Sequence, residues 1–194
     1  MHLVIYGPEG SGKGTQADNL GKLIKYPVFT SGDLVREASV KGEGKLHKIC
    51  KEALLKGIYV PDKQMYNLWE EKLKSEQALK GFILDGFPRN INQARFLVNK
   101  TKFYGYSLDG FIYLLLNDQK ATERLLKRQR KLFEGSSQTH DTPERIKSRL
   151  KTYREKENEI LQFFKEKNIL VEIDGEGTEG EVFARILNGL NIKG

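Results

Sequence analysis

The sequence predicts an α/β fold of three layers, in which a parallel five-stranded sheet is covered by helices on both faces. Short apolar runs of strand length recur along the chain, and at least one stretch with helical spacing separates each run from the next. Strands joined through helices lie parallel, and a parallel sheet is normally buried on both faces. The five predicted strands are residues 3–6, 28–30, 82–85, 111–116 and 169–173.

The helices are predicted from apolar residues that recur at three- and four-residue intervals, which places them on one helix face. We interpret these apolar stripes as core. Pro61 and Pro143 are assigned to the first turn of a helix, where a missing N–H costs nothing. The stripes are Ala17, Leu20 and Ile24, then Leu46, Ile49 and Ala53, and finally Ile146, Leu150, Tyr153, Ile160 and Phe164.

Length and composition narrow the class of protein. The 194 residues are enough for one α/β domain. The one cysteine, Cys50, cannot form a disulfide within the chain and is expected to be inert. The longest apolar run, residues 111–116, is far too short to span a bilayer, and no secretory leader pattern is visible. We therefore expect a cytoplasmic protein without membrane segments.

The formal net charge of +7 is compatible with a nucleic acid, an anionic membrane surface or a small polyanionic substrate as partner. Much of the lysine lies in helical stretches that are also rich in glutamate, which is typical of solvated helix faces. Arginine is more informative, because a guanidinium group matches the geometry of phosphate and several arginines stand at the ends of predicted elements.

A glycine-rich segment, GPEGSGKGT at residues 7–15, separates the first predicted strand from the first helix. The glycines allow several backbone N–H groups to converge on one anion, and Lys13 adds a positive charge at the helix N-terminus. A merely flexible turn does not account for a lysine and a hydroxyl at these offsets. Because Gly14 follows Lys13, the hydroxyl nearest a bound magnesium ion has to come from Thr15. We predict a nucleoside triphosphate site.

Polar residues also follow the later strands. Ligands of such a sheet bind beyond the carboxyl ends of the strands. The second strand leads into TSGDLVR at residues 30–36, and the third ends in Asp85, the position at which phosphate-loop proteins place an acid near magnesium. Each feature alone has a simpler interpretation, because Asp85-Gly86 also fits a plain turn and Ser31 or Asp33 a helix cap.

Four segments in this order, GPEGSGKGTQ, TSGDLVR, DGFPRNINQA and ERLLKR, resemble those of the adenylate kinases, a family of nucleoside monophosphate kinases. The resemblance extends over essentially the whole chain. It implies reversible, Mg²⁺-dependent phosphoryl transfer from ATP to AMP, giving two ADP, for adenine nucleotide homeostasis. It also implies a monomer, without a nucleic-acid partner. The implied parts are a core of residues 1–30, 61–128 and 143–194, a helical monophosphate-binding insertion at residues 31–60, and a short lid at residues 129–142.

The resemblance further implies roles for individual residues. The implied ATP contacts are Gly10, Ser11, Gly12, Lys13, Gly14, Thr15, Arg124, Arg128 and Gly177. The implied AMP contacts are Ser31, Arg36, Val60, Gly86, Arg89 and Gln93. The implied catalytic side chains are Lys13, Arg89, Arg124, Arg128 and Arg149, while Asp85, Asp33 and Thr15 orient Mg²⁺ largely through water.

The preferred acceptor is predicted from two positions. In the similar uridylate and cytidylate kinases, the position of Ser31 is typically alanine and that of Gln93 is typically asparagine. A glutamine amide can pair with both an acceptor and a donor on the adenine edge. These residues favour AMP. A kinase with broader specificity, or one for CMP, UMP or dAMP, is the alternative.

The chemistry requires no catalytic base, because the phosphate of AMP is already an anion at neutral pH. The three histidines are scattered and are assigned neither a catalytic nor a metal-binding role; they are His2, His47 and His140.

The predicted lid departs from the family pattern. Counted back from Arg149 in the following helix, Gln138 stands where the family usually has a lid arginine. His140 stands where the family usually has the first of two acids, so only Asp141 of that pair is retained. The lid has no cysteines, so no structural metal is expected. Three explanations are open: Arg130 or Arg145 supplies the missing charge, the enzyme is slower or looser in donor choice, or the chain is a nucleotide-sensing module with an impaired lid.

Overall fold

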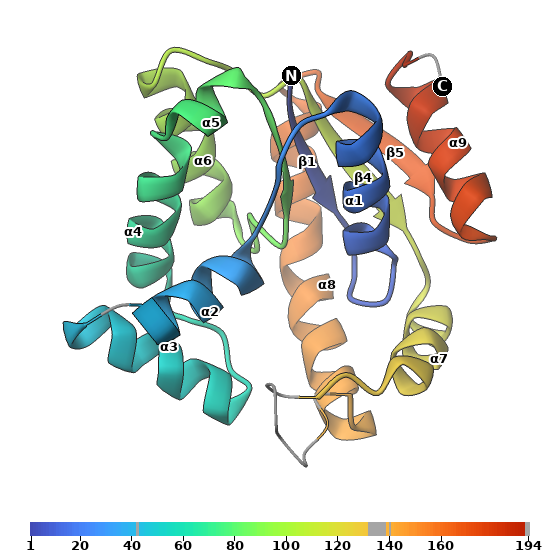
Figure 1. Cartoon of the computed structure of the whole chain (residues 1–194). Coiled ribbons are helices and arrows are strands. Elements are labelled where there is room, and N and C mark those ends of the chain that lie inside the picture. Colours follow the sequence, from blue (N-terminus) through green and yellow to red (C-terminus); the bar gives the residue numbers. More distant parts are fainter. Residues whose placement is uncertain (42, 132–138, 140, 193–194) are drawn as a thin grey trace.

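The computed structural model describes residues 1–41, 43–131, 139 and 141–192. Its centre is a five-stranded parallel sheet in the order β2-β3-β1-β4-β5 (Figure 1). The predicted fold class is thereby confirmed, and each strand lies within one residue of its predicted bounds. The strands are β1 (His2–Tyr6), β2 (Val28–Thr30), β3 (Phe82–Asp85), β4 (Gly110–Leu115) and β5 (Leu170–Asp174).

The central strand β1 is the topological switch point of the sheet, where the chain changes the side on which it adds strands. It pairs with β3 on one side, where Ile5 lies opposite Asp85, and with β4 on the other, where Tyr6 lies opposite Tyr113. The chain therefore builds β2 and β3 to one side of β1 before it crosses to β4 and β5. In open α/β sheets this switch point forms a crevice for ligands. The glycine-rich loop leaves β1 at this place.

The helices confirm the predicted apolar stripes. Pro143 opens a helix as predicted, but Pro61 stands one residue ahead of one, with extended backbone at φ −60° and ψ 151°. Pro61 serves through its carbonyl group, which accepts the N–H of Met65, so the first turn begins at Asp62. The helices are α1 (Lys13–Ile24), α2 (Ser31–Lys41), α3 (Gly44–Lys56), α4 (Asp62–Leu73), α5 (Glu76–Lys80), α6 (Ile91–Phe103), α7 (Asp118–Arg128), α8 (Pro143–Lys165) and α9 (Glu179–Gly189).

The strands bury alternate side chains in two cores, one on each face of the sheet. Val4 and Tyr6 point to the face that α4, α6 and α8 cover, whereas Leu3 and Ile5 point to the face covered by α1 and α9 (Figure 1). This alternation is the period-two geometry of a strand, and both faces are apolar because both carry helices. Cys50 is buried in the first core, as expected for an inert thiol.

Helices α2 and α3 project from this core at the carboxyl ends of the strands (Figure 1). Helices α2 and α3 pack on each other and carry the chain from β2 to α4 (Figure 1). Between α7 and α8, Lys131 and Thr139 form an antiparallel bridge. The proposed boundaries of an insertion at 31–60 and a lid at 129–142 stay predictions. Within the described ranges, no helix is long and apolar enough to cross a membrane.

Candidate active site

The glycine-rich loop wraps tightly around the start of α1. Gly10 and Gly12 have φ values of 87° and 88°, in the left-handed region that favours glycine. A Cβ at Gly10 would also lie 2.8 Å from the carbonyl oxygen of Ala121, so the loop is in close contact with α7. The Lys13 ammonium group donates to the carbonyl oxygen of Pro8 at 2.8 Å and so crosses the loop. The N-terminus of α1 and one cation thus point to a common anion site.

Asp85 lies beside this loop, at the end of β3. A Cβ on Gly14 would be 3.5 Å from Asp85 Oδ2, and Thr15 is the next residue of α1. Burial raises the pKa of the Asp85 carboxyl group, although Lys13 and Arg89 act in the opposite direction. Burial likewise lowers the pKa of the Lys13 ammonium group, against the attraction of Asp85. An acid and an ammonium group therefore lie where the triphosphate is expected, next to the helix turn that carries Thr15.

Asp33, the second predicted metal-orienting acid, is hydrogen-bonded to residues at the end of β2 and in α2. It accepts Arg36 Nη2 at 2.6 Å and the hydroxyl of Thr30 at 2.7 Å. Partial burial opposes ionisation of Asp33, but these two hydrogen bonds outweigh it and lower the pKa. Across the residues that the structure describes, no group of three or more His, Cys, Asp or Glu side chains could hold a metal ion directly. A single carboxylate with phosphate oxygens and water remains a suitable set of ligands for Mg²⁺.

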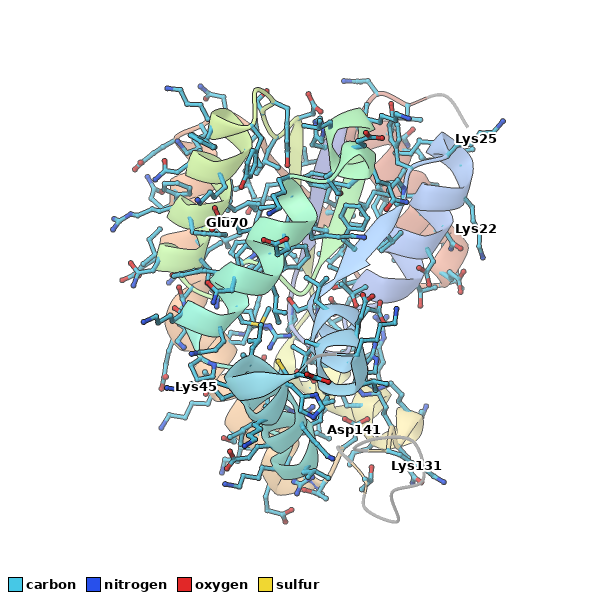
Figure 2. All side chains as sticks on the ribbon, turned by 60° about the vertical axis from the view of Figure 1, so that its left-hand side comes forward. Lys22, Lys25, Lys45, Glu70, Lys131 and Asp141 are labelled. Atoms are coloured by element: carbon cyan, nitrogen blue, oxygen red, sulfur yellow. The ribbon has the colours of Figure 1, made fainter. Side chains whose placement is uncertain are left out.

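Two predicted arginines converge on Asp141. Arg128 donates to it from Nε and Nη2, both at 3.0 Å, and Arg149 donates from Nη2 at 3.0 Å. The Asp141 side chain is wholly buried, and the backbone N–H of Arg130 adds another 3.0 Å bond. Burial alone would raise the pKa of Asp141, but the hydrogen bonds from the arginines hold it well below its usual range. Figure 2 labels Asp141 and Lys131, which both lie in the connection between α7 and α8.

A buried network behind this cluster determines where α8 lies. The Tyr113 hydroxyl on β4 donates to Glu157 Oε1 at 2.5 Å, and Arg154 donates to both oxygens of Glu157. Arg154 Nη2 also donates to the carbonyl oxygen of Leu116 at 2.6 Å. These bonds join α8, the helix that also carries Arg149, to the end of β4. Sequence patterns did not indicate this network, because Tyr113 and Leu116 lie 44 and 38 positions away from their partners on α8.

Arg124 joins the phosphate loop to the turn after β5. Both terminal nitrogens of its guanidinium group donate to the carbonyl oxygen of Gly175 at 3.2 Å, and Nη2 donates to Gly177 at 3.4 Å. Nη1 also donates to the carbonyl oxygen of Gly10 at 3.4 Å. The structure therefore brings together three of the predicted ATP-binding positions, which are distant in sequence.

A second pocket opens beside the loop and contains four of the six predicted AMP contacts, namely Ser31, Val60, Arg89 and Gln93. The Ser31 hydroxyl donates to the carbonyl oxygen of Gly86 at 2.7 Å, and Arg89 Nε donates to the same oxygen at 2.9 Å. Gly86 thus holds two of these side chains. Arg36 does not line this pocket, because it is paired with Asp33 and its side chain is 59% exposed.

The Gln93 amide is oriented by its neighbours. Its oxygen accepts the backbone N–H of Arg89 at 2.7 Å, and its nitrogen donates to Asp62 Oδ1 at 2.7 Å. Asn90 donates to the other oxygen of Asp62 at 2.8 Å. A primary amide has two N–H donors and two acceptor sites, so one of each remains for a ligand. Sequence reasoning identified Gln93 but missed Asp62, which directly follows the proline that precedes α4.

The pocket also has lining residues that the sequence analysis did not select. Tyr59 stacks on Arg89, with the guanidinium carbon 4.1 Å from the ring centroid. Lys156 on α8 adds a cation at the wall. Local sequence patterns gave no indication of Tyr59 or Lys156, since each of these residues faces side chains from other elements. The remaining unselected lining residues are Met65, Phe87 and Asn90.

The predicted lid lies partly within the described residues. Gln138 and His140 lie outside the described residues. Arg145 Nη1 donates to the carbonyl oxygen of Thr139 at 3.1 Å. Arg130, in contrast, donates its backbone N–H to Asp141 Oδ2 at 3.0 Å.

The fold and these contacts define a class of protein. A phosphate loop at the switch point of a parallel sheet is joined to a second polar pocket, and arginines from α7 and α8 meet beside the loop. This arrangement is that of a phosphotransferase acting on nucleotides.

Comparison with known proteins identifies the family. A model of the adenylate kinase family matches residues 5–169. An adenylate kinase of Xylella fastidiosa is 33% identical over 186 residues, which cover 96% of this chain and 97% of the relative. An adenylate kinase of Nocardioides sp. is 34% identical over 192 residues, covering 99% and 98%. One of Xanthomonas oryzae pv. oryzae is 34% identical over 190 residues, covering 98% and 99%. The chain belongs to the adenylate kinase family and is thus a nucleoside monophosphate kinase.

Proposed function

We propose that this chain catalyses reversible transfer of the terminal phosphoryl group of ATP to AMP, giving two ADP. The observation that carries the proposal is the contact between the phosphate loop and the second pocket. Tyr59 stacks on Arg89 of the second pocket, and its hydroxyl donates to Glu9 of the phosphate loop at 3.0 Å. Two nucleotides bound on either side of Tyr59 would therefore bring their phosphates together.

On the donor side, the loop from Gly10 to Thr15 binds the triphosphate through its N–H groups, and Lys13 exchanges the Pro8 carbonyl for a phosphate oxygen. Arg124 stacks beside the donor base, because it already lies against the turn at Gly175 and Gly177. Arg128 and Arg149 reach the transferring phosphoryl group. These assignments are supported by the convergence of the same residues around the loop.

On the acceptor side, Arg89 and Arg36 bind the phosphate of AMP, while Gln93 pairs with its base. Arg36 has to leave Asp33 and turn inward, which its exposed position allows. The free N–H and the free acceptor site of Gln93 fit the adenine edge, which offers one acceptor and one donor. Ser31, Val60 and Gly86 complete the pocket wall.

The chemistry follows from charge and position. The acceptor phosphate has a second pKa near 6, so at neutral pH it is mostly a dianion and needs no base to act as nucleophile. Phosphoryl transfer spreads negative charge over the equatorial oxygens, and fixed guanidinium groups stabilise that charge. Holding both phosphates in line removes a large entropic part of the barrier.

Magnesium fits this site as a water-bound ion. Asp85, Thr15 and, after Arg36 moves, Asp33 would orient it, mostly through its waters. A bound Mg²⁺ ion would supply positive charge that neutralises part of the charge on the phosphates. Titration with EDTA should abolish turnover, and restoring Mg²⁺ should recover it.

The test of the proposed function is a substrate panel. ADP formation from ATP is measured with AMP, dAMP, CMP and UMP as acceptors, and AMP should have the highest kcat/KM. A higher value for CMP or UMP would support the broader monophosphate kinase instead. ATP binding without any transfer would identify a nucleotide-sensing module.

A further inference from the structure

The phosphate loop contains a carboxylate that the proposed reaction does not use. Glu9 lies between Pro8 and Gly10, and its Oε2 atom is buried from solvent. That oxygen is 2.7 Å from Arg149 Nη1 and 3.9 Å from Arg128 Nη2. Glu9 thus contacts the two arginines that we assign to the transferring phosphoryl group.

The Arg149 guanidinium group is shared between two acids. Its Nη2 atom donates to Asp141 at 3.0 Å, and its Nη1 atom pairs with Glu9. Only 10% of the Arg149 side chain is exposed, so water screens these contacts weakly. Asp141 comes from the connection before α8, whereas Glu9 approaches from the loop. An anion is therefore already present on the side of Arg149 that faces the phosphate loop.

Tyr59 holds Glu9 in this orientation. Its hydroxyl donates to Glu9 Oε1 at 3.0 Å, while the other carboxylate oxygen, Oε2, pairs with Arg149. The Tyr59 ring is fixed in turn by stacking on Arg89. The carboxylate is thus held from both sides, by Arg149 and by the segment between α3 and α4.

We propose that Glu9 is a built-in competitor of the donor phosphate, which takes the place of a phosphate oxygen on Arg149 until a nucleotide displaces it, and that Tyr59 is its positioning residue. This inference rests on the donor site of the proposed function. Glu9 thereby sets the affinity for the triphosphate. Displacing it also breaks the hydrogen bond to Tyr59, so filling the donor site loosens one contact of the acceptor pocket.

The experiment measures binding of inorganic tripolyphosphate by isothermal titration calorimetry without magnesium, so that no ion bridges Glu9 to the ligand. Glu9→Gln should bind about threefold to tenfold more tightly than the unmodified protein, as expected for loss of one partly exposed charge contact. Glu9→Asp, which keeps the charge but shortens the reach to Arg149, should fall between the two. Glu123→Gln is the matched control, because Glu123 lies on α7 but pairs with Lys120.

Tyr59 is tested by a double-mutant cycle. Tyr59→Phe keeps the ring that stacks on Arg89 and removes only the hydroxyl. It should tighten tripolyphosphate binding by less than Glu9→Gln does, and it should have no further effect in the Glu9→Gln background. If Tyr59→Phe instead changed binding through the structure and not through Glu9, its effect would persist in the Glu9→Gln background.

Unchanged or weaker binding by Glu9→Gln would overturn the inference, and so would equal tightening by Glu123→Gln. Equal effects of Tyr59→Phe in both backgrounds would remove Tyr59 from the positioning role. The outcome is separable from the proposed function: AMP phosphorylation by the unmodified protein together with no Glu9 effect refutes only the inference. Tighter binding by Glu9→Gln in a chain that transfers no phosphoryl group refutes only the reaction.

Discussion

Asp62 at the start of α4 accepts a 2.7 Å hydrogen bond from the side-chain nitrogen of Gln93 on α6. The bond orients the amide, because a carboxylate accepts only from its N–H side. The predicted base-reading residue therefore depends on a partner 31 positions earlier in the chain.

Replacing Asp62 with asparagine should raise the KM for AMP about tenfold with a smaller effect on kcat, since the Gln93 amide loses a charged acceptor that holds its orientation. Steady-state kinetics at saturating ATP measure this split. Glu71→Gln, an exposed change on the same helix, should leave the KM unchanged. An unaltered KM in Asp62→Asn would show that the amide is held without Asp62.

Shortening Gln93 to asparagine should erode the preference for AMP over CMP by about tenfold or more, because the shorter amide cannot reach both Arg89 and the base. The ratio of kcat/KM for AMP and CMP is the measurement. Equal ratios in the two proteins would remove Gln93 from base recognition.

Asp141→Asn should lower the free energy of unfolding at pH 7 by about 1–3 kcal/mol, because it removes a buried charge that several hydrogen bonds satisfy. Since the arginines depress the pKa of Asp141 in the folded state, its contribution is present above the unfolded-state pKa and is lost as pH falls through the folded-state value. Urea unfolding should therefore show a stability gap that is constant near neutrality and narrows below about pH 4. A gap independent of pH would contradict this origin.

Arg130→Ala should reduce kcat about tenfold, while Arg145→Ala should have a smaller effect. The reason is that Arg130 is held by its backbone N–H against Asp141, the acid on which Arg128 and Arg149 converge, whereas the Arg145 guanidinium group is bound to the backbone of Thr139. Lys127→Ala, an exposed change on α7, is the control. If neither arginine variant slows single-turnover transfer, neither compensates for the glutamine at position 138.

Part of this structure could be predicted from short stretches of sequence. The strands and helix stripes were predictable because apolar periodicity reports which side chains face a common core. The phosphate loop was predictable because its glycines and Lys13 act through local backbone geometry. The start of α4 was predicted one residue too early, at Pro61. Helix boundaries are the least certain part of such a prediction, since one residue decides whether a proline precedes a helix or begins it.

The sequence by itself thus determined the parallel sheet, the loop and most side chains proposed for the nucleotides, since each depends on neighbours within a few positions. Only the tertiary structure decided how those side chains are held. Asp62 beneath Gln93, and Glu9 between Arg149 and Tyr59, are pairings of residues from different elements. Such contacts leave no periodic trace in the chain, because the sheet topology alone brings their partners within hydrogen-bonding distance.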